Sequence, residues 1–210
     1  MFLAKWSMLL SMKKQIPSGL PEKAYVLRVT LMGSKPPIWR DLSVPADCTL
    51  GVLHAILQIS FGWENDHMHS FTVNSVEYGM TDRGFDYGGS MADEDAVCLR
   101  DLNLRPRQKF IYLYDFGDSW EHEVRLSKTI STADAPGDLT LPRCLDGRRA
   151  GPLEDSGGVW GYESMLEILK DPNHAEYEDI HEWAGDFDPE YIDLEAINAK
   201  LKQAFTRGPR

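Results

Sequence analysis

The chain has 210 residues, of which 42% are hydrophobic, and its formal net charge is -11 at pH 7. This length supports one domain with a full core, and the negative charge argues against nonspecific nucleic-acid binding, which needs a basic surface. The three cysteines are too few and too widely spaced for a disulfide framework, so a reducing cytoplasm is the expected location.

Residues 1–22 are predicted to form a flexible or amphipathic arm. Lys5 interrupts their apolar residues, and no small-residue cleavage site follows, so they do not resemble a signal peptide. No stretch approaches the roughly 20 apolar residues of a membrane span. We therefore expect no membrane span and a single domain over residues 23–205.

Alternating apolar residues predict two paired strands at residues 25–31 and 38–44. Thr49 is a suitable N-cap for a helix whose apolar residues recur at helical spacing up to Phe61, and Gly62 is a suitable terminator. Short strands are then predicted at residues 69–73, 76–78 and 97–100, with a long surface loop over residues 79–95.

Residues 109–115 and 119–126 read as a β-hairpin with Gly117 and Asp118 in the turn. This register pairs Asp115 with Trp120 and Leu113 with His122. Asp115 and His122 then lie as diagonal neighbours on the apolar face, and they are the candidate catalytic acid and base. The favoured interpretation is structural, with Asp115 bound to turn amides and His122 a satisfied core histidine, and the catalytic role is the alternative.

The opposite face of this hairpin carries aromatic residues. Tyr112, Tyr114 and Phe116, with Trp39 on the second predicted strand, are candidate binding residues because exposed aromatic side chains are efficient anchors. The alternative is that they pack beneath loops or C-terminal helices.

The sheet core is predicted to span about residues 23–128, followed by an irregular segment at 129–160 and C-terminal helices within 161–205. Helices are expected at residues 162–169, 174–183 and 189–205, the last starting at Asp188 and Pro189. This C-terminal part is strongly acidic. Arg143, Arg148 and Arg149, with Glu154 and Asp155, form either a charged docking site or, as we favour, an ion-pair network that fastens the irregular segment.

Two histidines at i and i+2, His67 and His69, share a face if they lie on a strand and can then chelate a metal. Asp115 and His122, or the helix residue His54, would be needed to complete such a site. Two histidines alone make half a site, so no cofactor is favoured and a divalent metal is the alternative.

A small basic patch is the only expected route to nucleic acid. It comprises Arg100, Arg105, Arg107 and Lys109, which otherwise form a solvated loop.

Several long motifs resemble the plasmid pRiA4b ORF-3-like family. They are Pro37–Arg40, Phe61–Trp63, His67–His69, Tyr114–His122 and Glu154–Gly158. The resemblance implies an α+β fold, compatible with an antiparallel-rich, β-grasp-like sheet with one crossing helix. It also implies association with plasmids or other mobile elements, and no particular enzymatic activity.

The favoured function is therefore a noncatalytic binding or interaction module for a protein partner. One alternative is a metal-dependent hydrolase that uses His67, His69, Asp115 and His122. The other is a nucleic-acid-associated accessory protein of a mobile element. The partner's identity and the oligomeric state do not follow from the sequence.

Overall fold

A computed structural model describes residues 21–81, 91–134 and 140–205, and these residues form an α+β fold around one mixed sheet. The arm predicted for residues 1–22 lies outside the described residues up to residue 20, as do residues 82–90 of the predicted long loop. Within the described ranges, no helix combines the length and the hydrophobicity needed to cross a bilayer.

Within the described residues, the sheet has eight strands in the order β5-β4-β3-β6-β7-β1-β2-β8. Neighbouring strands pair antiparallel except for β4 and β5, which are parallel. The α+β prediction is confirmed, whereas the β-grasp-like description stays a prediction. The strands are β1 (Lys23–Leu31), β2 (Trp39–Pro45), β3 (His69–Val73), β4 (Val76–Gly79), β5 (Ala92–Asp93), β6 (Lys109–Tyr114), β7 (Trp120–Ser131) and β8 (Arg143–Arg148).

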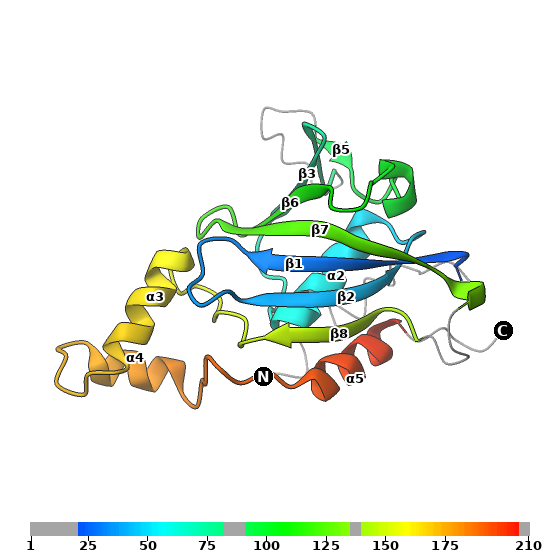
Figure 1. Cartoon of the computed structure of the whole chain (residues 1–210). Helices are drawn as coiled ribbons and strands as arrows, with labels where there is room; N and C mark the ends of the chain where they lie inside the picture. The colour runs from blue at the N-terminus through cyan, green and yellow to red at the C-terminus, as the bar shows by residue number, and fades with distance from the viewer. Residues whose placement is uncertain (1–20, 82–90, 135–139, 206–210) are drawn as a thin grey trace.

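Helix α2 (Leu50–Phe61) crosses one face of the sheet and is buried along nearly its whole length (Figure 1). As predicted, the Thr49 hydroxyl accepts a hydrogen bond from the Val52 amide at 3.2 Å, and Gly62 ends the helix at a φ of 85°. The left-handed conformation of Gly62 favours a residue without a Cβ atom. Helix α2 therefore forms the centre of the core.

In the part of the chain that the structure describes, three further helices follow the sheet: α3 (Gly158–Ile168), α4 (Tyr177–Ala184) and α5 (Leu194–Phe205). Helix α5 runs beside β8, whereas α3 and α4 form an arm that extends from one end of the sheet (Figure 1). The last helix begins later than predicted. Asp193, and not Asp188, caps it, with its Oδ1 accepting the Ala196 amide at 2.8 Å.

Two short elements also differ from prediction. The segment expected to be irregular contains β8, which pairs with β2 and extends the sheet beyond residue 128. The strand predicted at residues 97–100 does not form. Cys98 makes only an isolated bridge to Thr49, and the next residues form a 3₁₀ turn, η1 (Leu99–Leu102).

The β6–β7 hairpin is shifted by one residue from the predicted register. Tyr112 pairs with His122 and Tyr114 with Trp120, because the turn contains five residues, 115–119, and not two. Both ends of this turn, Asp115 and Ser119, have positive φ values. Since side chains alternate along a strand, the shift exchanges the two faces of β6 and buries both tyrosines.

Arg40 joins three parts of the core. Its side chain is only 1% exposed, and its guanidinium donates to the carbonyls of Ser60, Trp39 and Arg148. It also lies over the Phe61 ring, 4.9 Å from the centroid. Burial lowers the pKa of Arg40 to about 10, but these three carbonyls compensate for removing the cation from water.

We expect Arg40→Ala to lower the free energy of unfolding by about 3 kcal/mol, because it removes three hydrogen bonds to carbonyls, of which the bond to Ser60 is buried. Arg28→Ala is the matched control. Arg28 is 31% exposed and bonds to Asp41, so its loss should cost about 1 kcal/mol or less. Chemical denaturation measures both values, and equal losses would contradict this role of Arg40.

Candidate functional site

Three segments far apart in the sequence meet at one corner of the molecule. The α2–β3 loop supplies His67, the β6–β7 turn supplies Asp115, and the segment before α3 supplies Asp155. One ligand atom from each of these residues lies within 4.8 Å of the other two. We call these three residues the corner cluster.

Asp115 is held rigidly by backbone groups. Its Oδ1 accepts hydrogen bonds from the amides of Gly117 at 2.9 Å and Asp118 at 3.4 Å, and its own amide donates to Met68. The φ of Asp115 is 56°, a left-handed conformation that aspartate tolerates better than most residues. This leaves Oδ2 directed toward the corner, 3.4 Å from His67 Nδ1.

His67 lies between the two carboxylates. Its Nε2 is 3.2 Å from Asp155 Oδ1, and its side chain is 28% exposed. Asp155 is 74% exposed and has a φ of 60°. The corner cluster therefore has one ordered inner carboxylate, one histidine and one outer carboxylate open to solvent.

Tyr114 and Glu154 form a second layer beneath the corner cluster. The Tyr114 hydroxyl donates a short hydrogen bond to Glu154 Oε1, and the Glu64 amide donates to Oε2 at 2.8 Å. Burial raises the pKa of Glu154, and burial together with Glu154 raises the pKa of Tyr114. A half-buried carboxyl group thus lies next to Asp155 in the chain.

Trp63 anchors this layer to the core. Its ring stacks on Tyr114 with centroids 4.9 Å apart, and its Nε1 donates to the Pro152 carbonyl at 2.9 Å. These contacts fix residues 152–155 against the sheet. The corner is therefore supported by aromatic packing and by backbone hydrogen bonds.

His69, predicted to act with His67, lies elsewhere. His67 precedes β3, so the two side chains do not share a strand face. The His69 ring stacks on His54 at 3.4 Å, nearly parallel, and its Nε2 lies 2.7 Å from Glu94 Oε2 in the core. His54 also contacts the Tyr112 hydroxyl at 2.8 Å.

His122 also lies away from the corner cluster. It is fully buried, with Nδ1 3.0 Å from the Trp120 carbonyl and its ring packed edge-on against Phe61 and Trp63. Within the described parts of the chain, no hydrogen bond or ion pair joins it to Asp115. Burial lowers the pKa of His122 to about 3, so it is neutral at pH 7.

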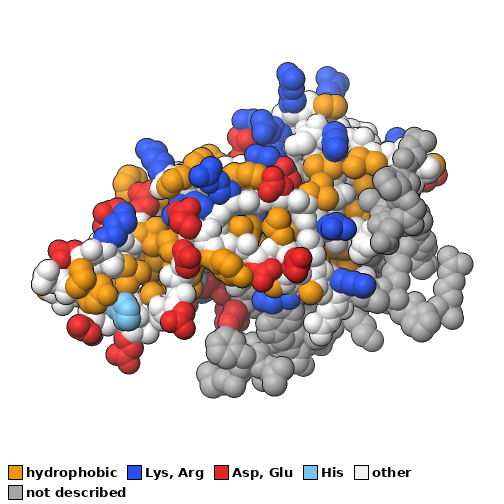
Figure 2. Space-filling view, turned by 60° about the horizontal axis from the view of Figure 1, so that its bottom comes forward, with side chains coloured by type: hydrophobic (Ala, Val, Ile, Leu, Met, Phe, Trp, Pro, Cys, Tyr) orange, Lys and Arg blue, Asp and Glu red, His pale blue; other side chains and the backbone are white. Residues whose placement is uncertain are grey.

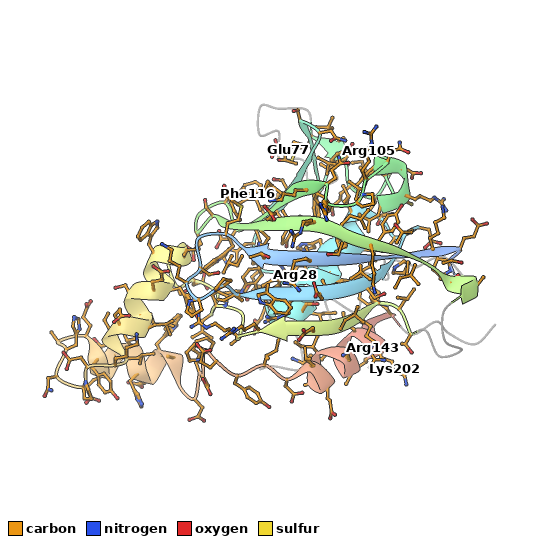
Figure 3. All side chains as sticks on the ribbon, viewed as in Figure 1. Arg28, Glu77, Arg105, Phe116, Arg143 and Lys202 are labelled. Carbon is orange, nitrogen blue, oxygen red and sulfur yellow. The ribbon has the colours of Figure 1, made fainter. Side chains whose placement is uncertain are left out.

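The four aromatic residues predicted to form a binding face do not share one exposed surface. Tyr112 and Tyr114 are buried, and half-buried Trp39 lies beneath the Arg28 guanidinium, 3.7 Å from the ring centroid. Phe116 remains partly exposed at the β6–β7 turn, and Figure 3 shows it there, with Arg28 on the sheet. The register of β6 accounts for this difference.

The two arginines have different surroundings. Arg149 is 4% exposed and donates to Glu190 Oε1 at 2.7 Å and to the Pro36 carbonyl, so its ion pair fastens the segment after β8. Its partner is Glu190, and not the predicted Glu154 or Asp155. Arg148 has an exposed side chain, and its carbonyl accepts from Arg40.

The basic patch has acidic neighbours. Lys109 pairs with Glu123 at 2.6 Å, and Arg100 lies 3.7 Å from Asp101. These pairs reduce the positive potential available to a phosphate backbone.

Sequence reasoning assigned no ligand role to Asp155. The sequence feature that draws attention to Asp155 is its place in the Glu154–Gly158 motif, where an acidic pair is followed by Ser156 and two glycines. This feature favours an ion pair with arginine, because the approach of the segment to His67 depends on tertiary packing.

Comparison with known proteins places these features in a wider group. A family model described as "Plasmid pRiA4b ORF-3-like protein" matches residues 23–196, which include all three members of the corner cluster. The uncharacterized protein y4hQ of Sinorhizobium fredii (strain NBRC 101917 / NGR234) is 34% identical over 175 residues, 82% of this chain and 87% of that protein. The crystal structure of MM3350, a protein of unknown function from Methanosarcina mazei Go1, matches with 39% identity and a TM-score of 0.73, over 83% of this chain and 97% of that one.

The buried His122 should make stability depend on pH. Its pKa is about 3 in the folded chain and about 6.5 when unfolded, so between pH 6.5 and pH 3 mainly the unfolded chain takes up this proton. Stability should therefore fall as the pH decreases from 6.5 toward 3, with a loss of about 2 kcal/mol from this group between pH 7.5 and pH 5.

Denaturant unfolding at several pH values tests this expectation. His122→Gln should remove that part of the pH dependence, whereas His181→Gln, at an exposed position on α4, should keep the wild-type slope. An unchanged slope in His122→Gln would contradict the assignment of a depressed pKa to His122.

Proposed function

The chain belongs to the plasmid pRiA4b ORF-3-like family, and we propose that it is a noncatalytic binding module that takes a divalent cation at the corner cluster. The observation that carries the proposal is the convergence of His67, Asp115 and Asp155 from three separate family-like motifs. Association with a plasmid or another mobile element is part of this proposal.

The donor set favours a particular class of cation. One imidazole nitrogen with two carboxylates suits Mn²⁺, Zn²⁺ or a similar transition metal better than Ca²⁺ or Mg²⁺, which prefer oxygen ligands. At bond lengths of about 2.1 Å, two ligands on opposite sides of an octahedral cation are about 4.2 Å apart. The three ligand atoms lie within 4.8 Å of one another. Asp115 faces His67 Nδ1 and Asp155 faces Nε2, so the imidazole must turn one nitrogen toward both carboxylates, and the exposed Asp155 must move inward.

Several contacts favour binding over catalysis. Asp115 Oδ1 is used by turn amides, Asp118 Oδ2 accepts the Gly157 amide at 3.0 Å, and both Glu154 oxygens accept hydrogen bonds. These groups hold the three segments together. A cation at the corner would add a cross-link between them and reduce the repulsion among their carboxylates.

Isothermal titration with Mn²⁺ and Zn²⁺ tests the cation site on untagged, chelator-treated full chain. We expect one cation per chain for the wild type and an affinity about tenfold or more weaker for Asp155→Asn. Asp155 is exposed, so this variant should keep its fold, which circular dichroism can check.

The matched control is Asp186→Asn, which replaces an exposed carboxylate outside the corner cluster by a neutral amide. It should bind as the wild type does. The absence of stoichiometric binding of either cation to the wild type, or equal weakening in both variants, would refute the cation site.

A second function, metal-dependent hydrolysis, is favoured by one observation. Glu154 is half-buried, its pKa is raised by burial, and it adjoins a residue of the corner cluster. A carboxyl group in this position can hold or release a proton beside a cation that activates water. The set would be His67, Asp115, Asp155 and Glu154, without His69 and His122.

Turnover of bis-nitrophenyl phosphate and nitrophenyl acetate with added Mn²⁺ separates the two functions. A hydrolase should show metal-dependent turnover that Glu154→Gln abolishes while it retains Mn²⁺ binding. A binding module should show no turnover above that of Asp155→Asn. Activity that is equal in all variants would come from a contaminant and would exclude this catalytic assignment.

A further inference from the structure

The arm formed by α3 and α4 exposes large aromatic side chains. Trp160 on α3 is 85% exposed and Trp183 on α4 is 48% exposed, and Tyr191 follows at 62%. Burial of such side chains is a main driving force of folding, so a tryptophan left almost completely in water contributes little to the fold. Exposed tryptophans of this kind are typical anchors of protein interfaces.

The same arm is strongly acidic. Residues 158–190 contain ten Asp and Glu residues and a single Lys or Arg, Lys170, which pairs with Glu167. Figure 2 shows orange apolar and red acidic side chains together at this end of the molecule. A basic partner would be attracted to this end, and a polyanion would be repelled.

The tryptophans and the acids are also matched along each helix. Trp160 and Glu163 are three residues apart on α3, and Asp179 and Trp183 are four residues apart on α4. Residues at these spacings are neighbours on a helix surface. Each indole ring therefore has a carboxylate one turn away, which is the combination that binds an Arg or Lys side chain by stacking and by ion pairing.

The start of the arm is fixed to the body of the protein. The Gly157 amide donates to Asp118 Oδ2, and Gly158 packs so tightly that a Cβ atom would lie 2.3 Å from the Asp118 carbonyl oxygen. Helix α3 therefore starts from a defined position, which reduces the entropy lost when a partner binds.

We propose that the α3–α4 arm docks an Arg- and Lys-rich segment of a partner protein, with Trp160 and Trp183 as its anchors. Charge complementarity, combined with the indole and carboxylate pairs, favours this occupant. The proposal does not depend on cation binding at the corner cluster.

Fluorescence anisotropy with a labelled 12-residue peptide of alternating Arg and Gly tests the proposal on the full chain at 150 mM NaCl. We expect saturable binding to the wild type and about tenfold weaker binding to Trp160→Ala and to Trp183→Ala. Asp179→Asn should also weaken binding, whereas Glu77→Gln, at an exposed acid on β4, should not. A peptide of alternating Glu and Gly should not bind.

Three outcomes would overturn the proposal. The first is no binding of the basic peptide to the wild type. The second is binding that responds to Asp179→Asn and Glu77→Gln alike and not to the tryptophan variants, which would indicate nonspecific charge attraction. The third concerns residues 1–20, which contain three lysines and no acid. If replacing Lys13 and Lys14 by Glu strengthened peptide binding, the chain's own N-terminal segment would be the occupant.

Discussion

The conformation of the β6–β7 turn determines which residues of β6 are buried and how the corner cluster is arranged. The Asp115 carboxylate accepts hydrogen bonds from two amides of the turn and so stabilises a turn of five residues. This odd length places Tyr112 and Tyr114 in the core, on the same face as His122, and leaves the second carboxylate oxygen of Asp115 facing His67. One side chain therefore sets the strand register and contributes to the corner cluster.

The same turn connects the sheet to the C-terminal helices. Asp118 binds the start of α3 through the Gly157 amide, and Tyr114 binds Glu154 in the preceding segment. The corner cluster and the base of the acidic arm thus depend on one set of contacts. A change at the turn would affect both candidate surfaces, even though their proposed ligands differ in charge and in chemistry.

Local signals predicted many of the elements correctly, but not those that depend on distant partners. Thr49 and Gly62 bound α2 as predicted because capping needs only neighbouring residues. Strand β8 was missed because it lies at the sheet edge, and only Cys144 among its residues is buried, so alternation is weak. Asp188 and Pro189 form a good helix start, but here Pro189 accepts the Ala150 amide and the helix begins later.

In the candidate site, too, local sequence patterns predicted some features, and contacts between distant residues decided the others. The sequence by itself determined the α+β class, the central helix, the family and the presence of His67 and Asp115 as residues to consider. Only the tertiary structure decided that Asp155 joins them, that His69 enters the core and that Asp115 lies apart from His122. The physical reason is that an alternating pattern defines two faces of a strand, but the length of the turn and the packing against α2 decide which face is buried.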